Sequence, residues 1–421
     1  MIISIFAAVT GFYLDLIATR ENGGIDLRNR IIGARLLRSG VDPYFFKWDR
    51  DTDERFVDPR DYYRNLPVSR VTVPPTLLFL HQILADIPYL FTKYLWLFLQ
   101  WLMFLIILYI MTAHTREPTR VILILFTGLL YIAGSYIWRL HTDRGQIYIF
   151  YVLLMSLSFA FLSGRSNLEY LLGGILAGIT AALRFPYLLV FLPFLLGGRW
   201  KFIIGGFTGF AMTIAASFFC CDLGNWQMYF KAMKVHELYH LGYIKTVCSK
   251  FPAQLVENLD NLEKSLFIHH PDSSIQGIFY RYWKIRIDAE TLILVFVTIL
   301  TVSVLVFLIM GRKKKYSDEI MFLSGINLVF LSEFFLPAFR FAYNNVIWLL
   351  PISLQFILVK RWIAFHVLLI ILFGIMFVYP VKMKAELLLA SDYLILFYCL
   401  MTNAYILMKY KLPRPDPIKE V

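Results

Sequence analysis

A short polar segment stands directly after the first apolar run of the chain, and it carries residue types suited to acid–base and phosphate chemistry. It begins at Asp26, continues with Arg28 and Arg30, and reaches Asp42 and Tyr44. A carboxylate can act as a general base toward a hydroxyl, and the planar guanidinium fork of arginine matches phosphate oxygens. Because ionisable groups beside lipid are expensive and usually functional, this segment is a candidate site.

The composition indicates that this segment belongs to a membrane protein. The 421 residues are 59% hydrophobic and 17% charged, and the mean hydropathy is +0.63. Soluble domains contain about 25% charged residues, so we expect an all-α polytopic membrane protein with room for about 12 transmembrane helices. The net charge of +12 is assigned to cytoplasmic loops that hold Lys and Arg, and no nucleic-acid partner is expected. Of the four cysteines, Cys220, Cys221 and Cys248 permit one disulfide without implying one.

Apolar runs predict where the spans lie, and the basic residues predict their orientation. The expected spans are 2–18, 94–113, 121–140, 146–163, 168–183, 186–198, 201–220, 291–311, 319–336, 346–359, 362–379 and 388–408. Every second connection carries a basic cluster, at 114–120, 164–165, 199–201, 312–315, 360–361 and from Lys409 onward. Placing these clusters in the cytoplasm puts both termini inside and the connections 19–93, 141–145, 184–186, 221–290, 337–345 and 380–387 outside. The first run lacks the flanks of a cleavable signal peptide, so we expect a retained span.

One apolar run is too short to cross a membrane. Residues 74–88 would form a helix of about 22 Å, below the thickness of the hydrocarbon core. We therefore expect a re-entrant or surface-lying helix there. The whole chain, 1–421, then forms a single transmembrane domain. It has a first outward loop at 19–93, a large outward loop at 221–290 and a cytoplasmic tail at 409–421.

The outward connections contain further polar residues. The connection after the third span holds Asp143, Arg144, Gly145 and Gln146, and Arg184 stands before Pro186 between two short helices. The late connection holds Arg340, Tyr343, Asn344 and Asn345, with Glu333 shortly before it. The arginines either bind phosphate, or anchor lipid headgroups, or pair with carboxylates for stability. Asp15, inside the first span, is expected to be a buried, hydrogen-bonded carboxylate.

The order of these elements resembles glycosyltransferase family 87, the polyprenyl-phosphate-mannose-dependent mannosyltransferases of the GT-C superfamily. The resemblance rests on elements that occur in this order: Asp26, Gly40-Val41-Asp42-Pro43-Tyr44, Pro74-Pro75, Gly145-Gln146, Arg184-Phe185-Pro186 and the stretch from Pro337 to Tyr343. The chain departs from the family pattern at Arg30 and Ile31, where aromatics are common. It departs again at Phe339, Arg340 and Tyr343, where Trp and His are common.

The resemblance implies a GT-C-type fold, with juxtamembrane or re-entrant helices in the non-cytoplasmic loops, and a reaction on the non-cytoplasmic face. A hexose, mannose-like, would pass from a polyprenyl-phosphate donor to a lipid or glycan acceptor of the cell envelope, with inversion and without a required cofactor or metal. The protein would lie in a bacterial inner or plasma membrane. Asp26 would be the general base. Donor phosphate or sugar would contact Arg28, Arg30, Gln146, Arg184 and Arg340, and acceptor or sugar would contact Asp42, Tyr44, Tyr343 and Asn344.

Two other classes of protein stay open at this point. His236-Glu237-Leu238-Tyr239-His240 matches the His-Glu-x-x-His pattern, in which two imidazoles one helical turn apart bind zinc in a metalloprotease. The same stretch also reads as an amphipathic interfacial helix with incidental histidines. A non-catalytic transporter of lipid or solute would equally explain spans with charges, although the halves of the chain show no convincing repeat.

Overall fold

The computed structural model of the protein describes residues 2–21, 23–46, 53–56, 71–164, 166–240, 272–311, 316–336, 340–359 and 385–409. Within these ranges the regular elements are all helical, which confirms the expected all-α class. The α-helices are α1 (Ile2–Glu21), α2 (Ile25–Arg38), α3 (Pro75–His81), α4 (Tyr89–Ala113), α5 (Pro118–Phe126), α6 (Tyr136–Asp143), α7 (Tyr148–Leu162), α8 (Asn167–Leu183), α9 (Phe191–Leu196), α10 (Trp200–Ser217), α11 (Leu223–His240), α13 (Ile275–Trp283), α14 (Ala289–Gly311), α15 (Asp318–Phe335), α16 (Leu349–Leu358) and α18 (Ala385–Lys409). Short 3-10 segments precede α9 and α16, at Phe185–Val190 and Ala342–Trp348.

Four described helices are long and apolar enough to cross a membrane. They are Ile2–Glu21, Tyr89–Ala113, Ala289–Ile309 and Leu389–Met408, and the bent pair α6–α7 would make a fifth. Several expected spans correspond to shorter apolar helices, such as α8 and the paired segments Phe185–Leu196 and Ala342–Leu358. The described residues therefore do not confirm the expected count of about 12 spans. The expected span 362–379, the basic connections 312–315 and 360–361, and residues 241–271 of the loop 221–290 lie outside the described residues.

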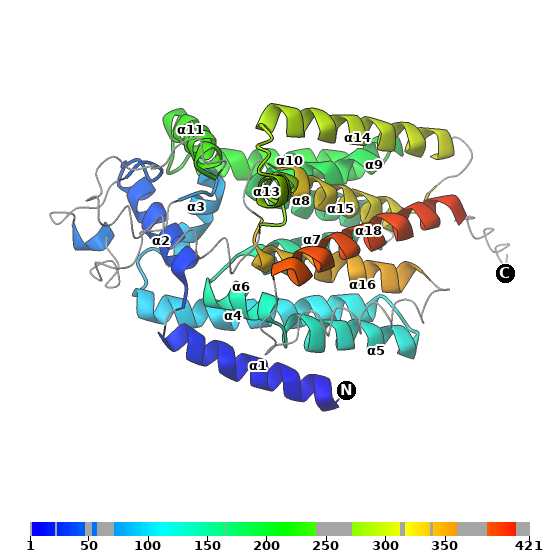
Figure 1. The fold of residues 1–421 in the computed structure, drawn as a ribbon, viewed down its shortest axis with the longest axis horizontal. Helices are drawn as coiled ribbons and strands as arrows, with labels where there is room; N and C mark the ends of the chain where they lie inside the picture. The colour runs from blue at the N-terminus through cyan, green and yellow to red at the C-terminus, as the bar shows by residue number, and fades with distance from the viewer. Residues whose placement is uncertain are drawn as a thin grey trace.

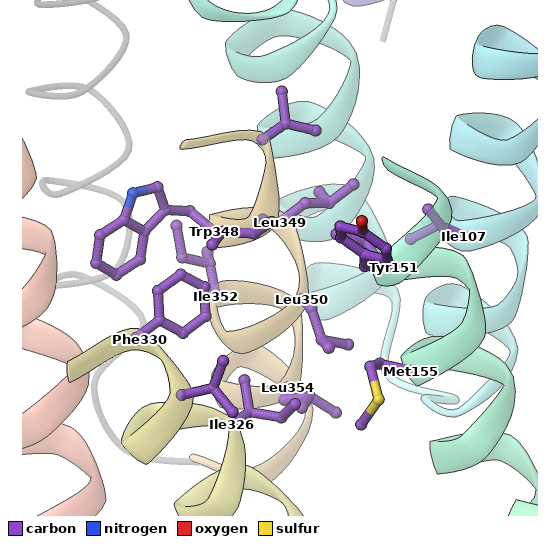
Figure 2. Packing of buried hydrophobic residues seen from close by; sticks show 14 of the residues in the cluster. Ile107, Tyr151, Met155, Ile326, Phe330, Trp348, Leu349, Leu350, Ile352 and Leu354 are labelled. Atoms are coloured by element: carbon purple, nitrogen blue, oxygen red, sulfur yellow. The ribbon is translucent and has the colours of Figure 1, made fainter. Parts of the chain in front are cut away.

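The helices pack around one large apolar core. Figure 2 shows part of it, where α16 and the segment before it meet α7 and α15. The rings of Trp348 and Phe330 stack with centroids 4.3 Å apart, and the side chain of Trp348 is fully buried. Elsewhere α8 and α10 approach so closely that a Cβ on Gly178 would lie 2.0 Å from the carbonyl oxygen of Gly206. Small residues at such crossings are typical of helix packing in membranes.

A group of short helices lies at one end of this bundle. Figure 1 shows α2, α3 and α11 together at the left of the view. A second apolar cluster holds them together, with Leu37, Leu78, Trp226 and Tyr229 among its members. The run 74–88 forms α3 and one short 3-10 turn, Gln82–Leu84. It is a short apolar helix, and its re-entrant or surface-lying position stays a prediction. It begins where Pro75 occupies the first helical turn, a position that suits proline.

The structure differs from the expected span at 121–140. The run 121–140 is not one helix: α5 continues as a π-helical segment to Ile132, and α6 begins after Ser135, whose side chain caps it. After α6 the chain turns by 108° into α7.

Asp15 is buried as expected, and its Oδ2 accepts hydrogen bonds from the indoles of Trp101 and Trp138, each at 3.0 Å.

Candidate active site

The corner between α6 and α7 caps the first turn of α2. A helix leaves its first amide groups without partners inside the helix, and here the corner supplies the acceptors. The carbonyl of Asp143 accepts from the amide of Gly24 at 2.6 Å, and the carbonyl of Arg144 accepts from the amides of Asp26 and Leu27 at 3.0 and 3.3 Å. The two segments are far apart in the sequence, and these bonds fix them against each other.

Gly145 makes this contact possible. Its φ is +65°, in the left-handed region that favours glycine. A Cβ at this position would lie 2.7 Å from the Cβ of Leu27 and 3.1 Å from the Cα of Gly24. The corner therefore requires a glycine both for its backbone conformation and for its contact with α2.

The carboxylate of Asp26 faces the corner and is bound by two of its side chains. Arg144 donates to it from Nε at 2.7 Å and from Nη2 at 3.1 Å, and the amide of Gln146 donates to Oδ2. Both members of the ion pair keep some exposure, 17% for the side chain of Asp26 and 23% for that of Arg144. The predicted meeting of Asp26 with Gln146 is thus present, and a carboxylate reachable by a hydroxyl stands at the end of the bundle.

Arg30 holds this arrangement from the buried side. It donates to the carbonyl of Gly145, to Oε1 of Gln146 at 3.5 Å, and from Nε to Nε2 of His81 at 3.2 Å. Since Oε1 of Gln146 accepts from Arg30, its amide nitrogen points to Asp26. Burial lowers the pKa of Arg30. The side chain serves the corner, and we do not include it among the proposed phosphate contacts.

His81 is the neutral acceptor that this geometry needs. Burial, together with the charge of Arg30, lowers its pKa to about 3. Its Nδ1 lies 2.8 Å from the carbonyl of Leu77, which assigns the proton to Nδ1 and leaves Nε2 as acceptor. A charged imidazole would place a second cation against Arg30.

Aromatic rings cover the other side of Arg144. Its guanidinium lies 5.5 Å from the ring centroid of Tyr343 and 5.9 Å from that of Phe341, within the range of cation–π attraction. Burial alone would lower the pKa of Arg144, but the carboxylate of Asp26 and its hydrogen bonds raise it above its ordinary value. Arg144 is therefore a permanent cation beside the carboxylate.

A second guanidinium lies next to the same aromatic group. Arg184, between α8 and the following 3-10 segment, lies 5.0 Å from the ring centroid of Tyr148, and that ring is 5.9 Å from Tyr343. Arg184 pairs with Glu333 through both nitrogens of its fork, with Nε 2.8 Å from Oε1. Although burial opposes its charge, Glu333 raises the pKa of Arg184. Glu333 is 2% exposed and Arg184 is 22% exposed, so the arginine presents the open edge of the pair.

The other expected contact residues have mixed positions. Asn344, beside Tyr343, is buried with its Oδ1 unpartnered, and Arg28 is buried on α2. Tyr44 donates from its hydroxyl to the carbonyl of Val73 at 3.0 Å, and Asp42 accepts from the amide of Tyr44 at 2.9 Å. Tyr44 ties its segment to the cluster of short helices, whereas the bond of Asp42 is local to that segment.

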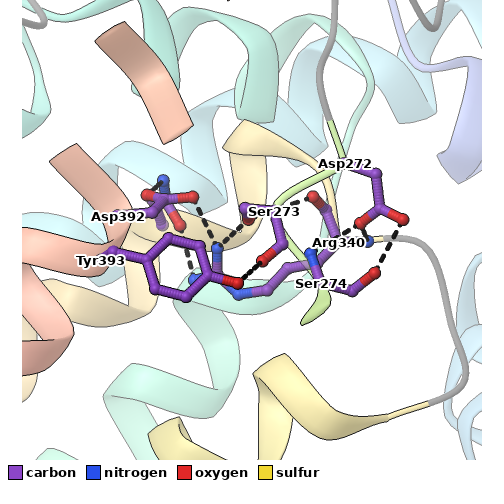
Figure 3. A network of polar contacts seen from close by, with 7 residues as sticks. Asp272, Ser273, Ser274, Arg340, Asp392 and Tyr393 are labelled. Atoms are coloured by element: carbon purple, nitrogen blue, oxygen red, sulfur yellow. Dashed lines mark hydrogen bonds and ion pairs between the residues drawn. The ribbon is translucent and has the colours of Figure 1, made fainter. Parts of the chain in front are cut away.

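Arg340 has internal partners, contrary to what a phosphate ligand requires. Its guanidinium binds Asp392 and Ser273, as Figure 3 shows. It also binds Asn345, and the side chain is 1% exposed. We therefore leave Arg340 out of the proposed phosphate contacts. The sequence offered no sign of this pairing, because Asp392 stands alone in an apolar run.

Other residues of the site had no assigned role at the level of sequence. Arg144 and Glu333 stood out only as charged residues of the outward side. Tyr148 and His81 lie in apolar runs, and nothing in their sequence context marked them. Among the described residues, no group of three or more His, Cys, Asp or Glu could hold a metal. The side chains of His236, Glu237 and His240, in the last turns of α11, lie outside the described part.

Comparison with known proteins bears on the chemistry of this corner. Residues 72–247 match the model of glycosyltransferase family 87. The matched segment contains Arg144, Gln146 and Arg184, and it confirms the resemblance seen in the sequence. The family indicates a glycosyltransferase, and the apolar helices agree with a membrane protein. No curated protein and no solved structure matches the chain.

Proposed function

We propose that the protein transfers a hexose, mannose-like, from a polyprenyl-phosphate donor to a lipid or glycan acceptor on the non-cytoplasmic face of the membrane. The observation that carries the proposal is the partly exposed carboxylate of Asp26 between Arg144 and Gln146, with Arg184 beyond Tyr148. A base and two cations next to one another are what this reaction requires. The donor lipid places its phosphate at the membrane boundary, where such a group of side chains can reach it.

The proposed chemistry is an inverting displacement. Asp26 accepts the proton of the acceptor's hydroxyl group, while the oxygen of that hydroxyl group forms a bond to the anomeric carbon of the sugar. The bond from that carbon to the phosphate oxygen breaks, and the electron pair leaves with the phosphate. Arg144 and Arg184 stabilise the second negative charge that develops on the phosphate. A phosphate is already a good leaving group, so the scheme needs no general acid.

The remaining side chains have roles in binding. Gln146, Tyr343 and Asn344 are candidates for hydrogen bonds to the sugar or the acceptor, and Arg28 remains a candidate for the phosphate. Asp42 and Tyr44 belong to the segment packed beside Tyr229, where an acceptor could bind. In the proposed topology the basic connections and both termini are cytoplasmic. The short helices α2, α3 and α11 then lie outside, over the ends of the spans.

The experiment is sugar transfer from a radiolabelled polyprenyl-phosphate hexose in membranes that contain the full chain. We expect transfer by the wild type and a loss of about 100- to 10,000-fold for Asp26→Asn, the range for removal of a general base. The matched control is Asp86→Asn, because Asp86 also pairs with an arginine, Arg38, but is largely exposed and distant from the corner. Full activity of Asp26→Asn would refute the mechanism. Absence of transfer by the wild type with every polyprenyl-phosphate hexose would refute the donor.

A further inference from the structure

The buried network around Arg340 joins three segments that are distant in the sequence. The guanidinium donates to Asp392 of α18 at 2.8 Å and to Ser273, before α13, at 2.6 Å. It also donates to the side chain of Asn345 at 2.6 Å, and the amide of Asn345 in turn donates to Asp392. Figure 3 shows these side chains converging, with Tyr393 reaching the backbone of the same segment. Its hydroxyl donates to the carbonyl of Ser273 at 3.0 Å.

The backbone of Arg340 is fixed as firmly as its side chain. Its amide donates to Oδ1 of Asp272 at 2.9 Å, and its carbonyl accepts from the amide of Ser273 at 3.2 Å. Asp272 also accepts from the amide and the hydroxyl of Ser274. Separation of a buried ion pair leaves uncompensated charges in the interior and is costly. Arg340 and Asp392 are therefore held in one geometry.

The network ends one residue before the rings that cover Arg144. Phe341 follows Arg340 directly, and its ring stacks on Tyr343 with centroids 5.1 Å apart. Both rings face the guanidinium of Arg144, and Arg144 holds Asp26. Asn345, on the far side of Tyr343, is the second anchor of the same short stretch. The stretch that carries the rings is thus pinned at both ends.

We infer that Arg340 and Asp392 are positioning residues, which hold Phe341 and Tyr343 over Arg144 and so fix the cation beside the base. The inference rests on the proposed function for its catalytic consequence. It assigns to α18, a helix without any member in the Asp26 site, a direct part in setting the geometry of that site. It also explains why two charges are kept in a place where apolar residues would pack.

The kinetic consequence follows from the charge that develops on the phosphate. A donor phosphodiester carries one negative charge when bound and the leaving phosphate carries two, so a misplaced Arg144 weakens the transition state more than the bound donor. We expect Asp392→Asn to lower kcat by about tenfold while KM for the donor changes by about twofold or less. The matched control is Asp318→Asn, which breaks the pair of Asp318 with Arg199 at the start of α15 and has no contact with the rings. It should leave both constants near those of the wild type.

A double variant separates positioning from stability. Arg340→Met/Asp392→Leu replaces the buried pair by apolar side chains, a change that often preserves or raises stability. Because no charge is left buried without a partner, thermal stability should return to that of the wild type. Because the hydrogen bonds to Ser273 and Asn345 are lost, kcat should stay low. Recovery of kcat together with stability would overturn the inference.

A second measurement needs no substrate and so stands apart from the proposed function. Tyr343→Cys, in a background where the four native cysteines are replaced by Ala, reports how far position 343 is exposed to a membrane-impermeant maleimide. Tyr343 is buried, and loosening of its stretch by Asp392→Asn should speed labelling by about tenfold through local opening. An unchanged labelling rate would overturn the inference. A wild type without transferase activity would leave the labelling result standing and would refute the proposed function alone.

Discussion

Replacement of Arg144 by Lys tests whether the fork of this arginine, and not only its charge, serves the base. The change keeps a cation beside Asp26 but cannot reproduce two hydrogen bonds, at 2.7 and 3.1 Å, from one planar group. Loss of one charge-assisted hydrogen bond costs about 1.5–3 kcal/mol. The attraction to the two covering rings also weakens, because a compact ammonium group does not stack as a planar guanidinium does.

These terms give the size of the kinetic effect. At about 1.4 kcal/mol for each factor of ten, we expect kcat/KM of Arg144→Lys to fall by about 10- to 150-fold. The assay is steady-state transfer from the labelled donor, with the protein in bilayers and Tm measured on the same samples. A large loss of kcat/KM with little change in Tm would place the effect in the reaction.

The chain offers a closely matched control. Arg38 also binds Asp86 through two nitrogens, Nη1 and Nη2 in place of the Nε and Nη2 of Arg144, but the side chains are 46% and 74% exposed. Exposed pairs contribute about 0–1 kcal/mol, so Arg38→Lys should leave both stability and kcat/KM nearly unchanged. If Arg144→Lys retained kcat/KM within about twofold of the wild type, the two-pronged contact would have no part in the reaction, and the reasoning from the geometry would be refuted.

Three further predictions use the same assays. Gly145→Ala should abolish transfer and lower Tm, because its Cβ would clash with α2, whereas Gly40→Ala, at φ +72° with open space around it, should cost only about 1 kcal/mol of backbone strain; equal effects would refute the role of the corner. His81 has a folded pKa of about 3 and an ordinary value of 6.5, so the unfolded chain binds the extra proton first. Stability from this group is then complete above pH 6.5 and is lost as the pH falls toward 3; a Tm profile in which His81→Gln keeps the same slope over that range would contradict this. Arg184→Gln should destabilise by about 3–5 kcal/mol, because Glu333 is left buried without its partner, and Arg184→Gln/Glu333→Gln should recover Tm without recovering transfer. Recovery of transfer in the double variant would exclude Arg184 from phosphate binding.

Hydropathy located most helices but misplaced their ends where a charge or a break has a tertiary cause. The run 94–113 was expected as a span, and α4 starts earlier, at Tyr89. Lys93 made the start look like a loop, yet its ammonium group donates to the carbonyls of Thr19 and Arg20 at 2.6 and 3.1 Å. It thus satisfies the end of α1, where helices attract cations. No local pattern announces such a partner.

The break before α6 was not predicted, because the apolar run around it looked like one continuous helix. The run from 121 to 140 is predominantly apolar, so its mean hydropathy gives no sign of a change in direction. Ser135 is the one local cue, because it caps α6. The bend places Arg144 and Gln146 beside α2, and only tertiary packing determines it.

Topology predicted which segments would meet at the site, but not what each arginine would bind there. Counting the basic clusters placed the segments of Asp26, Gln146 and Arg184 on one side of the membrane, and the structure brings these residues into one group. Arg30 and Arg340 belonged to the same expectation. Both instead bind internal partners: Arg30 binds His81 and Arg340 binds Asp392. Each of these partners stands within a largely apolar run of the sequence. The partner of a buried arginine is a property of the fold, and residue type alone does not disclose it.

The charges gathered at the site explain why carboxylates can be present in the proposed phosphate site. Arg28, Arg30, Arg144 and Arg184 bring four positive charges, and Asp26, Asp143 and Glu333 bring three negative ones, which leaves one positive charge over. A donor phosphodiester, with a single negative charge, would neutralise it. In the proposed reaction Asp26 gains a proton as the phosphate gains its second negative charge, so the protein groups then carry two positive charges against two on the phosphate. The site is balanced before and after transfer, because the proton that the base accepts matches the charge that the leaving group acquires. Asp26→Asn would hold the site at the second balance from the start. This variant should therefore bind the released polyprenyl phosphate more tightly than the donor, and its preference for the released phosphate should exceed that of the wild type. Equilibrium binding of both lipids to both proteins measures this preference. An unchanged preference in Asp26→Asn would refute the charge argument.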